Sequence, residues 1–109
     1  MECAEQANEV IIWLRSRTFL LALLTEIQES NGKPPLTVIL AVLTRWTTHY
    51  LSYKRLLELQ SSLFMLKDHS RLRESGTRES QQKTDEMVGI IGNPVFWHHL
   101  ARYVEFYPP

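Results

Sequence analysis

Arg45 and Trp46 are adjacent residues whose side chains together suggest one specific chemistry, the binding of a nucleic acid. An exposed indole can stack on a base, which is worth about 1–3 kcal/mol, and a guanidinium can hold a phosphate. Thr44 precedes them as a candidate N-cap, because its hydroxyl can accept a hydrogen bond from an amide in the first helical turn. The other free amides of that turn attract anions. These three residues therefore form a candidate nucleic-acid-binding site.

A structural role for the same residues competes with this interpretation. Trp46 leads an apolar stripe that continues through Tyr50, Tyr53 and Leu57 at helical spacing. In that case the indole would lie in the core of the domain, and Arg45 would be an ordinary solvent-facing neighbour. The sequence leaves both interpretations of Trp46 open.

No other set of residues suggests a catalytic or metal-binding site. His98 and His99 are adjacent, so on a helix their rings would point about 100° apart and could not easily share one metal ion. Cys3 is the single cysteine and lies near a terminus, where an inert thiol is expected. Asp68 and Asp85 flank a polar segment and are expected to be solvated rather than held rigidly around metal ions. The sequence therefore predicts no metal, no cofactor and no small-molecule ligand.

Composition limits the class of protein and of partner. The chain has 109 residues, enough for one small domain, and its apolar content of 44% is that of a globular protein. Twelve basic residues balance twelve acidic ones, which disfavours strong autonomous DNA binding and leaves only local patches, such as His49, Lys54 and Arg55. The apolar runs are too short to span a membrane, and no signal peptide is evident, so an intracellular, non-secreted protein is expected.

The hydropathy pattern predicts an all-α chain with three to four helices in a single region, 1–109. The predicted elements are a helix over about 4–29, a connector over 30–43, a helix over about 44–67, a polar linker over 68–83, and helices over about 84–91 and 94–107. The polar segment 68–83 is either a solvated linker or a frayed helical segment. The two long helices should pack as an antiparallel pair, with the last helix across them.

Glycine, proline and asparagine residues set several of these boundaries. Gly32 suits a left-handed helix cap, and the prolines that follow it prevent continuation. Asn93 and Pro94 predict the start of the last helix, with Asn93 as the N-cap. The apolar run Leu36–Leu43 is either a buried helical turn or an extended connector, because periodicity cannot separate the two.

The segment Thr44-Arg45-Trp46-Thr47-Thr48, followed by Tyr50 and by Arg55-Leu56-Leu57-Glu58-Leu59, resembles a conserved segment of hAT superfamily DNA transposases. The order of the flanking elements agrees: an apolar helix with a Gly/Pro loop comes before the segment, and a Phe-Trp pair with a helix comes after it. The closely matching part covers about sixteen residues. Where the family usually has serine, this chain has Thr47 or Thr48, which keeps the hydroxyl group.

The resemblance implies the start of the all-helical insertion that splits the ribonuclease H-like core of these enzymes. In the family the tryptophan is implicated in stabilising a flipped base during DNA hairpin formation, beside its arginine. By position, that role would pass to Trp46 and Arg45. No acidic residue of this chain matches the family's catalytic triad, whose members are expected before Met1 and beyond Pro109. The resemblance thus implies an incomplete domain.

The sequence leads to one main hypothesis and one alternative. The main hypothesis is a non-catalytic fragment resembling a hAT-type transposase, nuclear by resemblance, which retains at most residual DNA binding through Arg45 and Trp46. The alternative is a helical module that binds a protein partner through exposed apolar helix faces and has no nucleic-acid role. Neither hypothesis makes the chain an enzyme or a membrane protein.

Overall fold

The computed structural model describes residues 3–38, 46–73 and 77–106, and the side chains of 46–48 and 73 are not described. In this part of the chain six α-helices and one short 3-10 helix are present, and there is no strand. They are α1 (Cys3–Arg15), α2 (Thr18–Ser30), α3 (Trp46–Glu58), α4 (Gln60–Lys67), η1 (Ser70–Arg73), α5 (Arg78–Ile91) and α6 (Pro94–Phe106). The all-α class is confirmed, whereas the expected number of three to four helices is too low.

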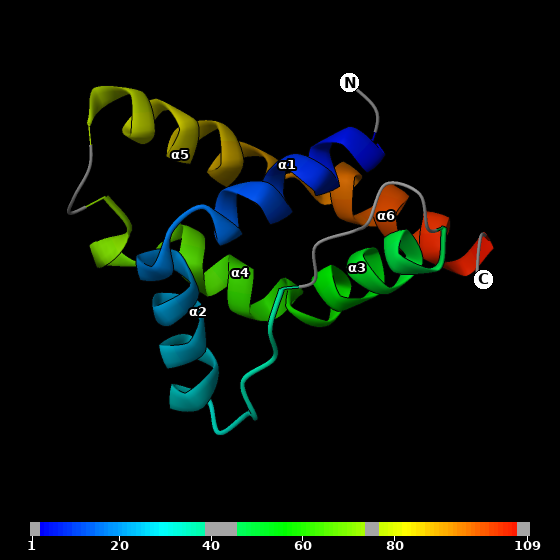
Figure 1. Cartoon of the computed structure of the whole chain (residues 1–109), viewed down its shortest axis with the longest axis horizontal. Coiled ribbons are helices and arrows are strands. Elements are labelled where there is room, and N and C mark those ends of the chain that lie inside the picture. Colours follow the sequence, from blue (N-terminus) through cyan, green and yellow to red (C-terminus); the bar gives the residue numbers. More distant parts are fainter. Residues whose placement is uncertain (1–2, 39–45, 74–76, 107–109) are drawn as a thin grey trace.

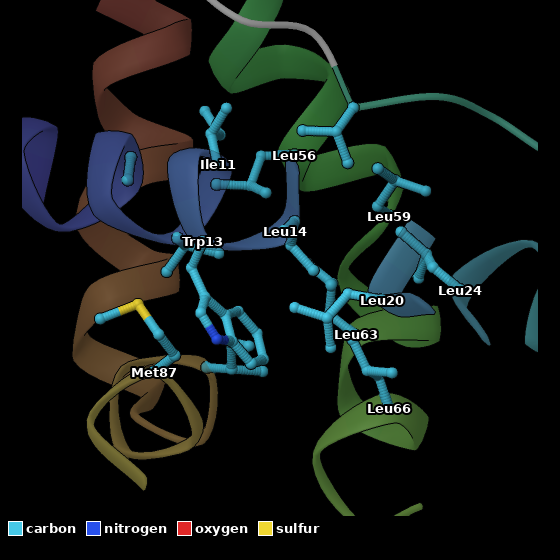
Figure 2. Packing of buried hydrophobic residues seen from close by; sticks show 14 of the residues in the cluster. Ile11, Trp13, Leu14, Leu20, Leu24, Leu56, Leu59, Leu63, Leu66 and Met87 are labelled. Carbon is cyan, nitrogen blue, oxygen red and sulfur yellow. The ribbon is translucent and has the colours of Figure 1, made fainter. Parts of the chain in front are cut away.

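Helix α1 is the centre of the packing. It contacts α2, α3, α5 and α6, and Figure 1 shows it running between α5 above and the α3–α4 pair below. This position requires apolar residues on more than one side of the helix. Its buried residues are Ala7, Val10, Ile11, Trp13 and Leu14. Figure 2 shows the adjacent side chains of Trp13 and Leu14 diverging, toward Met87 of α5 and toward Leu20 and Leu63 respectively.

The predicted helix over 4–29 is in fact two helices, which corrects the expectation of a long antiparallel pair. Ser16 folds its hydroxyl back onto the carbonyl oxygen of Trp13, at 2.6 Å, and Arg17 is extended, with φ −139° and ψ 130°. This turn redirects the chain so that α2 packs mainly on α4. The apolar spacing continues through the turn because both halves contribute to one core, and so periodicity could not reveal the break.

The predicted helix over 44–67 ends at Lys67 as expected, but a single residue interrupts it. Leu59 lies between α3 and α4 with φ −90° and ψ −1°, and its amide is shared between the carbonyls of Arg55 and Leu56. Leu59 is itself fully buried, so the interruption bends the helix pair around the core.

The predicted linker over 68–83 contains two helical elements, η1 and the first turns of α5. Thr77 caps α5: its hydroxyl oxygen accepts a hydrogen bond from the amide of Ser80 at 3.2 Å. Residues 78–83 lack apolar side chains, so no hydrophobic pattern marks this half of α5. Of the two alternatives predicted for this polar segment, the helical one holds for residues 78–83, because a cap and helix propensity suffice without a buried face.

Two helix ends follow the sequence signals closely. Gly32 has φ 71°, and the amides of Gly32 and Lys33 donate to the carbonyls of Glu29 and Gln28, which is a Schellman motif. At the start of α6, the side-chain oxygen of Asn93 accepts a hydrogen bond from the amide of Val95 at 3.0 Å. The predicted left-handed cap at Gly32 and the predicted N-cap at Asn93 are both confirmed.

The connector between α2 and α3 is neither helix nor strand over its described residues, 33–38. Gln28 holds it: the side-chain oxygen accepts from the amide of Leu36 at 2.8 Å, and the side-chain nitrogen donates to the carbonyl of Leu36 at 3.1 Å. Gln28 is buried. Its side-chain amide supplies the hydrogen-bond partners that a neighbouring strand would otherwise give to an extended segment. The rest of the predicted apolar run, 39–43, lies outside the described residues.

Gln28→Ala is expected to lower the free energy of unfolding by about 1–3 kcal/mol, because two backbone groups of Leu36 lose their partner. Urea unfolding followed by far-UV circular dichroism measures the change. Gln82→Ala, at an exposed position of α5, is the matched control and should change stability by less than about 0.5 kcal/mol. Equal effects of the two substitutions would show that the Gln28 amide does not hold the connector.

Candidate nucleic-acid interface

The predicted site lies at the junction of the connector and α3. Trp46 is the first described residue of α3 and lies within the predicted helix over about 44–67. Thr44 and Arg45 lie outside the described residues, and so does the side chain of Trp46. The N-cap role of Thr44, the phosphate role of Arg45 and the exposure of Trp46 therefore remain predictions.

The first described turn of α3 carries no charge that would repel an anion. The first turn of α3 contains no acidic residue, and the helix is thirteen residues long. Free amides at a helix N-terminus carry a partial positive charge and attract anions over roughly one turn. Any phosphate contact by Arg45 would thus be placed beside a favourable helix dipole.

Helix α3 is anchored by Tyr53, about two turns after Trp46. Tyr53 is buried, its hydroxyl donates to the side-chain oxygen of Asn8 at 3.1 Å, and its ring meets the edge of Tyr103 at 5.4 Å. Burial, with Tyr103 and Cys3 nearby, raises the pKa of the Tyr53 hydroxyl despite the opposing effect of its hydrogen bond to Asn8. The hydroxyl therefore stays protonated and ties α3 to α1 and α6.

The three residues predicted to extend a positive surface have different environments. Lys54 is exposed on α3. Arg55 donates from Nη1 to the carbonyl of Thr37 at 2.9 Å, and its Nε lies 3.9 Å from a carboxylate oxygen of Glu58. The imidazole of His49 is half-buried and tilted against Tyr53, with 6.0 Å between ring centroids. The structure thus brings Arg55 onto the connector that leads to Arg45, a link that the sequence spacing does not reveal.

The histidines, the cysteine and the aspartates that could take part in enzyme or metal chemistry lie in separate environments. His98 and His99 are both exposed, with ring centroids 6.0 Å apart. The Cys3 thiol lies 3.7 Å from the carbonyl oxygen of Phe96, and burial raises its pKa, which disfavours the reactive thiolate. Asp68 pairs with Lys67 at 3.0 Å. Among the residues that the structure describes, no group of three or more His, Cys, Asp or Glu could hold a metal ion.

A hollow between the start of α1 and the end of α6 was not predicted. It has a volume of about 320 Å³ and is lined by Cys3, His99, Arg102, Tyr103 and Phe106. The guanidinium of Arg102 lies over the ring of Phe106, 5.3 Å from its centroid. Sequence spacing gives no sign of this hollow, because only the fold brings α1 and α6 together.

None of the described helices is long and apolar enough to cross a membrane. Comparison with known proteins adds no relative: no protein-family model, no curated protein and no solved structure matches this chain.

Proposed function

We propose that this chain is a non-catalytic helical fragment of the hAT transposase type that contacts DNA at the N-terminus of α3. The resemblance of residues 44–59 motivates the proposal, and the start of α3 at Trp46 is the observation that carries it. Under this proposal, Arg45 and Trp46 lie beside the free amides of a helix end, where phosphate is favoured. The same proposal assigns the chain to the nucleus and gives it no catalytic activity of its own.

The contact is expected to combine stacking with charge. Trp46 would stack on an unpaired base, Arg45 would hold the adjacent phosphate, and Thr44 would cap the helix that presents both. A DNA hairpin is the suitable ligand, because its loop offers unstacked bases next to a duplex backbone. Binding should weaken steeply with salt, since phosphate contacts release counterions.

Trp46→Ala is expected to weaken binding of a labelled DNA hairpin by about 1–3 kcal/mol, or roughly 5- to 150-fold in Kd, because one stacked base loses its partner. Fluorescence anisotropy at low ionic strength measures Kd, and far-UV circular dichroism checks the helix content. Phe64→Ala is the matched control: it removes an aromatic side chain that is 36% exposed and lies roughly 27 Å further along the α3–α4 axis.

Three results would decide the role of Trp46. Weaker hairpin binding with unchanged helix content supports the stacking role. Loss of helix content on Trp46→Ala places the indole in the core and contradicts it. Absence of any salt-sensitive DNA binding at low ionic strength contradicts DNA binding by this chain altogether.

A helical protein-interaction module is the second candidate. It is favoured by the hollow beside α6, because Phe106 at its edge is 60% exposed and Tyr103 is half-buried. An apolar side chain of a partner would cover this surface. Phe106→Ala should abolish partner binding and leave DNA binding unchanged if this candidate is correct, whereas Trp46→Ala should do the reverse under the first proposal.

A further inference from the structure

We propose that the end of α1, the connector 33–38 and α3 form a surface that binds the phosphate backbone of a nucleic acid. We call it the connector surface and define it by Arg15, Lys33, Lys54 and Arg55. The inference rests on the proposed function for the class of its ligand, but it uses side chains other than those of the predicted stacking site.

The charges of this chain are unevenly distributed although they sum to zero. Residues 10–25 and 30–57 together contain six basic residues and no acidic one. The remaining six basic residues share the rest of the chain with all twelve acidic residues. The connector surface is drawn from the two acid-free segments, so a local positive potential arises without a net positive charge.

The fold brings two arginines from these segments to adjacent peptide groups. Arg15, the last residue of α1, donates from Nη1 to the carbonyl of Val38 at 3.1 Å. Arg55 of α3 donates from Nη1 to the carbonyl of Thr37 at 2.9 Å. Forty residues separate the two arginines in sequence, but they lie on either side of the same stretch of connector. In Figure 1 this stretch runs from the end of α2 toward the junction of α3 and α4.

Each guanidinium retains donors after its contact with the connector. An arginine guanidinium carries five N–H groups, and the carbonyl oxygen of the connector accepts only one of them. A phosphate can accept two N–H groups from one guanidinium. Arg15 is exposed, and Arg55 is partly exposed. Both side chains are held in place by their backbone contacts, so little further conformational entropy is lost when a phosphate binds.

Lysines extend the surface along the connector and along α3. Lys33 opens the connector and is exposed, with its ammonium 3.1 Å from the hydroxyl of Ser61. Lys54 is exposed on α3 and precedes Arg55 in the sequence, so their side chains leave the helix about 100° apart. Two carboxylates are paired nearby. Glu58 lies 3.9 Å from the buried Nε of Arg55 and offsets part of its charge, whereas Glu26 pairs with Arg71 at 3.4 Å.

Spaced cations along an extended segment suit a repeating anion better than a single one. A nucleic-acid strand presents such a repeat, and basic grooves that follow a backbone bind single strands in this way. Basic residues alone can also attract an anionic membrane surface, but such a surface presents its charges over a plane rather than along one strand. Phosphate groups of a nucleic acid are therefore the ligand that we infer.

The test compares the salt dependence of binding to a labelled oligothymidylate, which has no hairpin. The triple variant Arg15→Gln, Lys33→Gln, Lys54→Gln is expected to reduce the slope of log K against log salt by about 2, since each lost contact removes roughly 0.7. Lys83→Gln, on α5 beside Glu86, is the matched control and should leave the slope unchanged. Arg15→Lys retains the charge and should also retain the slope, which separates loss of charge from loss of structure.

The outcomes separate this inference from the proposed function. A reduced slope in the triple variant with wild-type helix content supports the connector surface, even if Trp46→Ala leaves hairpin binding unchanged. An unchanged slope, or an equal reduction by Lys83→Gln, overturns the connector surface even if Trp46 proves to stack. Binding to phosphatidylserine vesicles without binding to oligothymidylate also overturns it and identifies a membrane ligand.

Discussion

Trp97→Ala is expected to lower the free energy of unfolding by about 3–5 kcal/mol, the largest effect of any single substitution considered for this protein. Trp97 is 4% exposed, and its indole N–H donates to the carbonyl of Ile91 at 2.7 Å. Ile91 is the last residue of α5, so this hydrogen bond satisfies a carbonyl that a helix end would leave without a partner. The substitution removes both the ring and the bond.

The ring also joins two helices, α6 and α4, through aromatic contacts. It meets the edge of Phe96 at 5.0 Å and of Phe64 at 6.0 Å, which links α6 to α4. Such pairs contribute about 0.5–1.5 kcal/mol beyond the area that they bury. The cavity left by alanine would lie where α4, α5 and α6 meet, and these helices cannot close it without giving up other contacts.

Two further variants separate the ring from the hydrogen bond. Trp97→Phe keeps an aromatic ring and loses the donor, so about 1–3 kcal/mol of destabilisation is expected. His98→Ala changes an exposed neighbour on the same helix and should have an effect below about 0.5 kcal/mol. Urea unfolding, followed by far-UV circular dichroism, measures all three. If Trp97→Ala were no more destabilising than His98→Ala, the packing of α6 described above would be incorrect.

Leu14→Ala is expected to destabilise the chain by about 2–5 kcal/mol through the cavity it leaves in the centre of the fold. Leu14 has no exposed surface, and Figure 2 shows its side chain pointing toward Leu20 and Leu63, which belong to α2 and α4. Because α1 contacts four other helices, a cavity here lies between elements that are each held elsewhere. Collapse around the missing atoms is thereby limited.

Ile12 provides a matched control for Leu14 on the same helix. It is a similar aliphatic side chain, but it is 58% exposed. Ile12→Ala removes little buried surface and introduces the best helix former, so the change should lie within about 0.5 kcal/mol of zero. The midpoints of urea unfolding compare the two variants. Similar losses for Ile12→Ala and Leu14→Ala would contradict the assignment of the core face of α1.

The helical class and several helix ends were predictable because they depend on local interactions. Gly32 reverses the chain with a positive φ, and Asn93 caps α6, both through hydrogen bonds within a few residues. The apolar stripe around Tyr53 was likewise visible as a spacing of three and four residues. These features depend little on which distant helices surround them.

The missed features depend on contacts between distant residues or lack an apolar signal. The turn at Ser16 and Arg17 exists because α2 packs on α4, and apolar spacing is identical on either side of it. The first turns of α5 are stabilised by the Thr77 cap and have no buried apolar face. In the sequence nothing distinguishes Gln28 from an ordinary polar residue. Only the path of the connector buries it and brings it within hydrogen-bonding distance of Leu36.

For the candidate site, the sequence alone determined the residues of interest, Thr44, Arg45 and Trp46, and the expectation that a helix begins there. It did so because capping, stacking and phosphate binding depend on residue type at adjacent positions. The tertiary structure alone decided which side chains contact the connector at Thr37 and Val38. Arg15 and Arg55 meet at the connector because α1 and α3 pack in one core, and no spacing along the chain encodes that meeting.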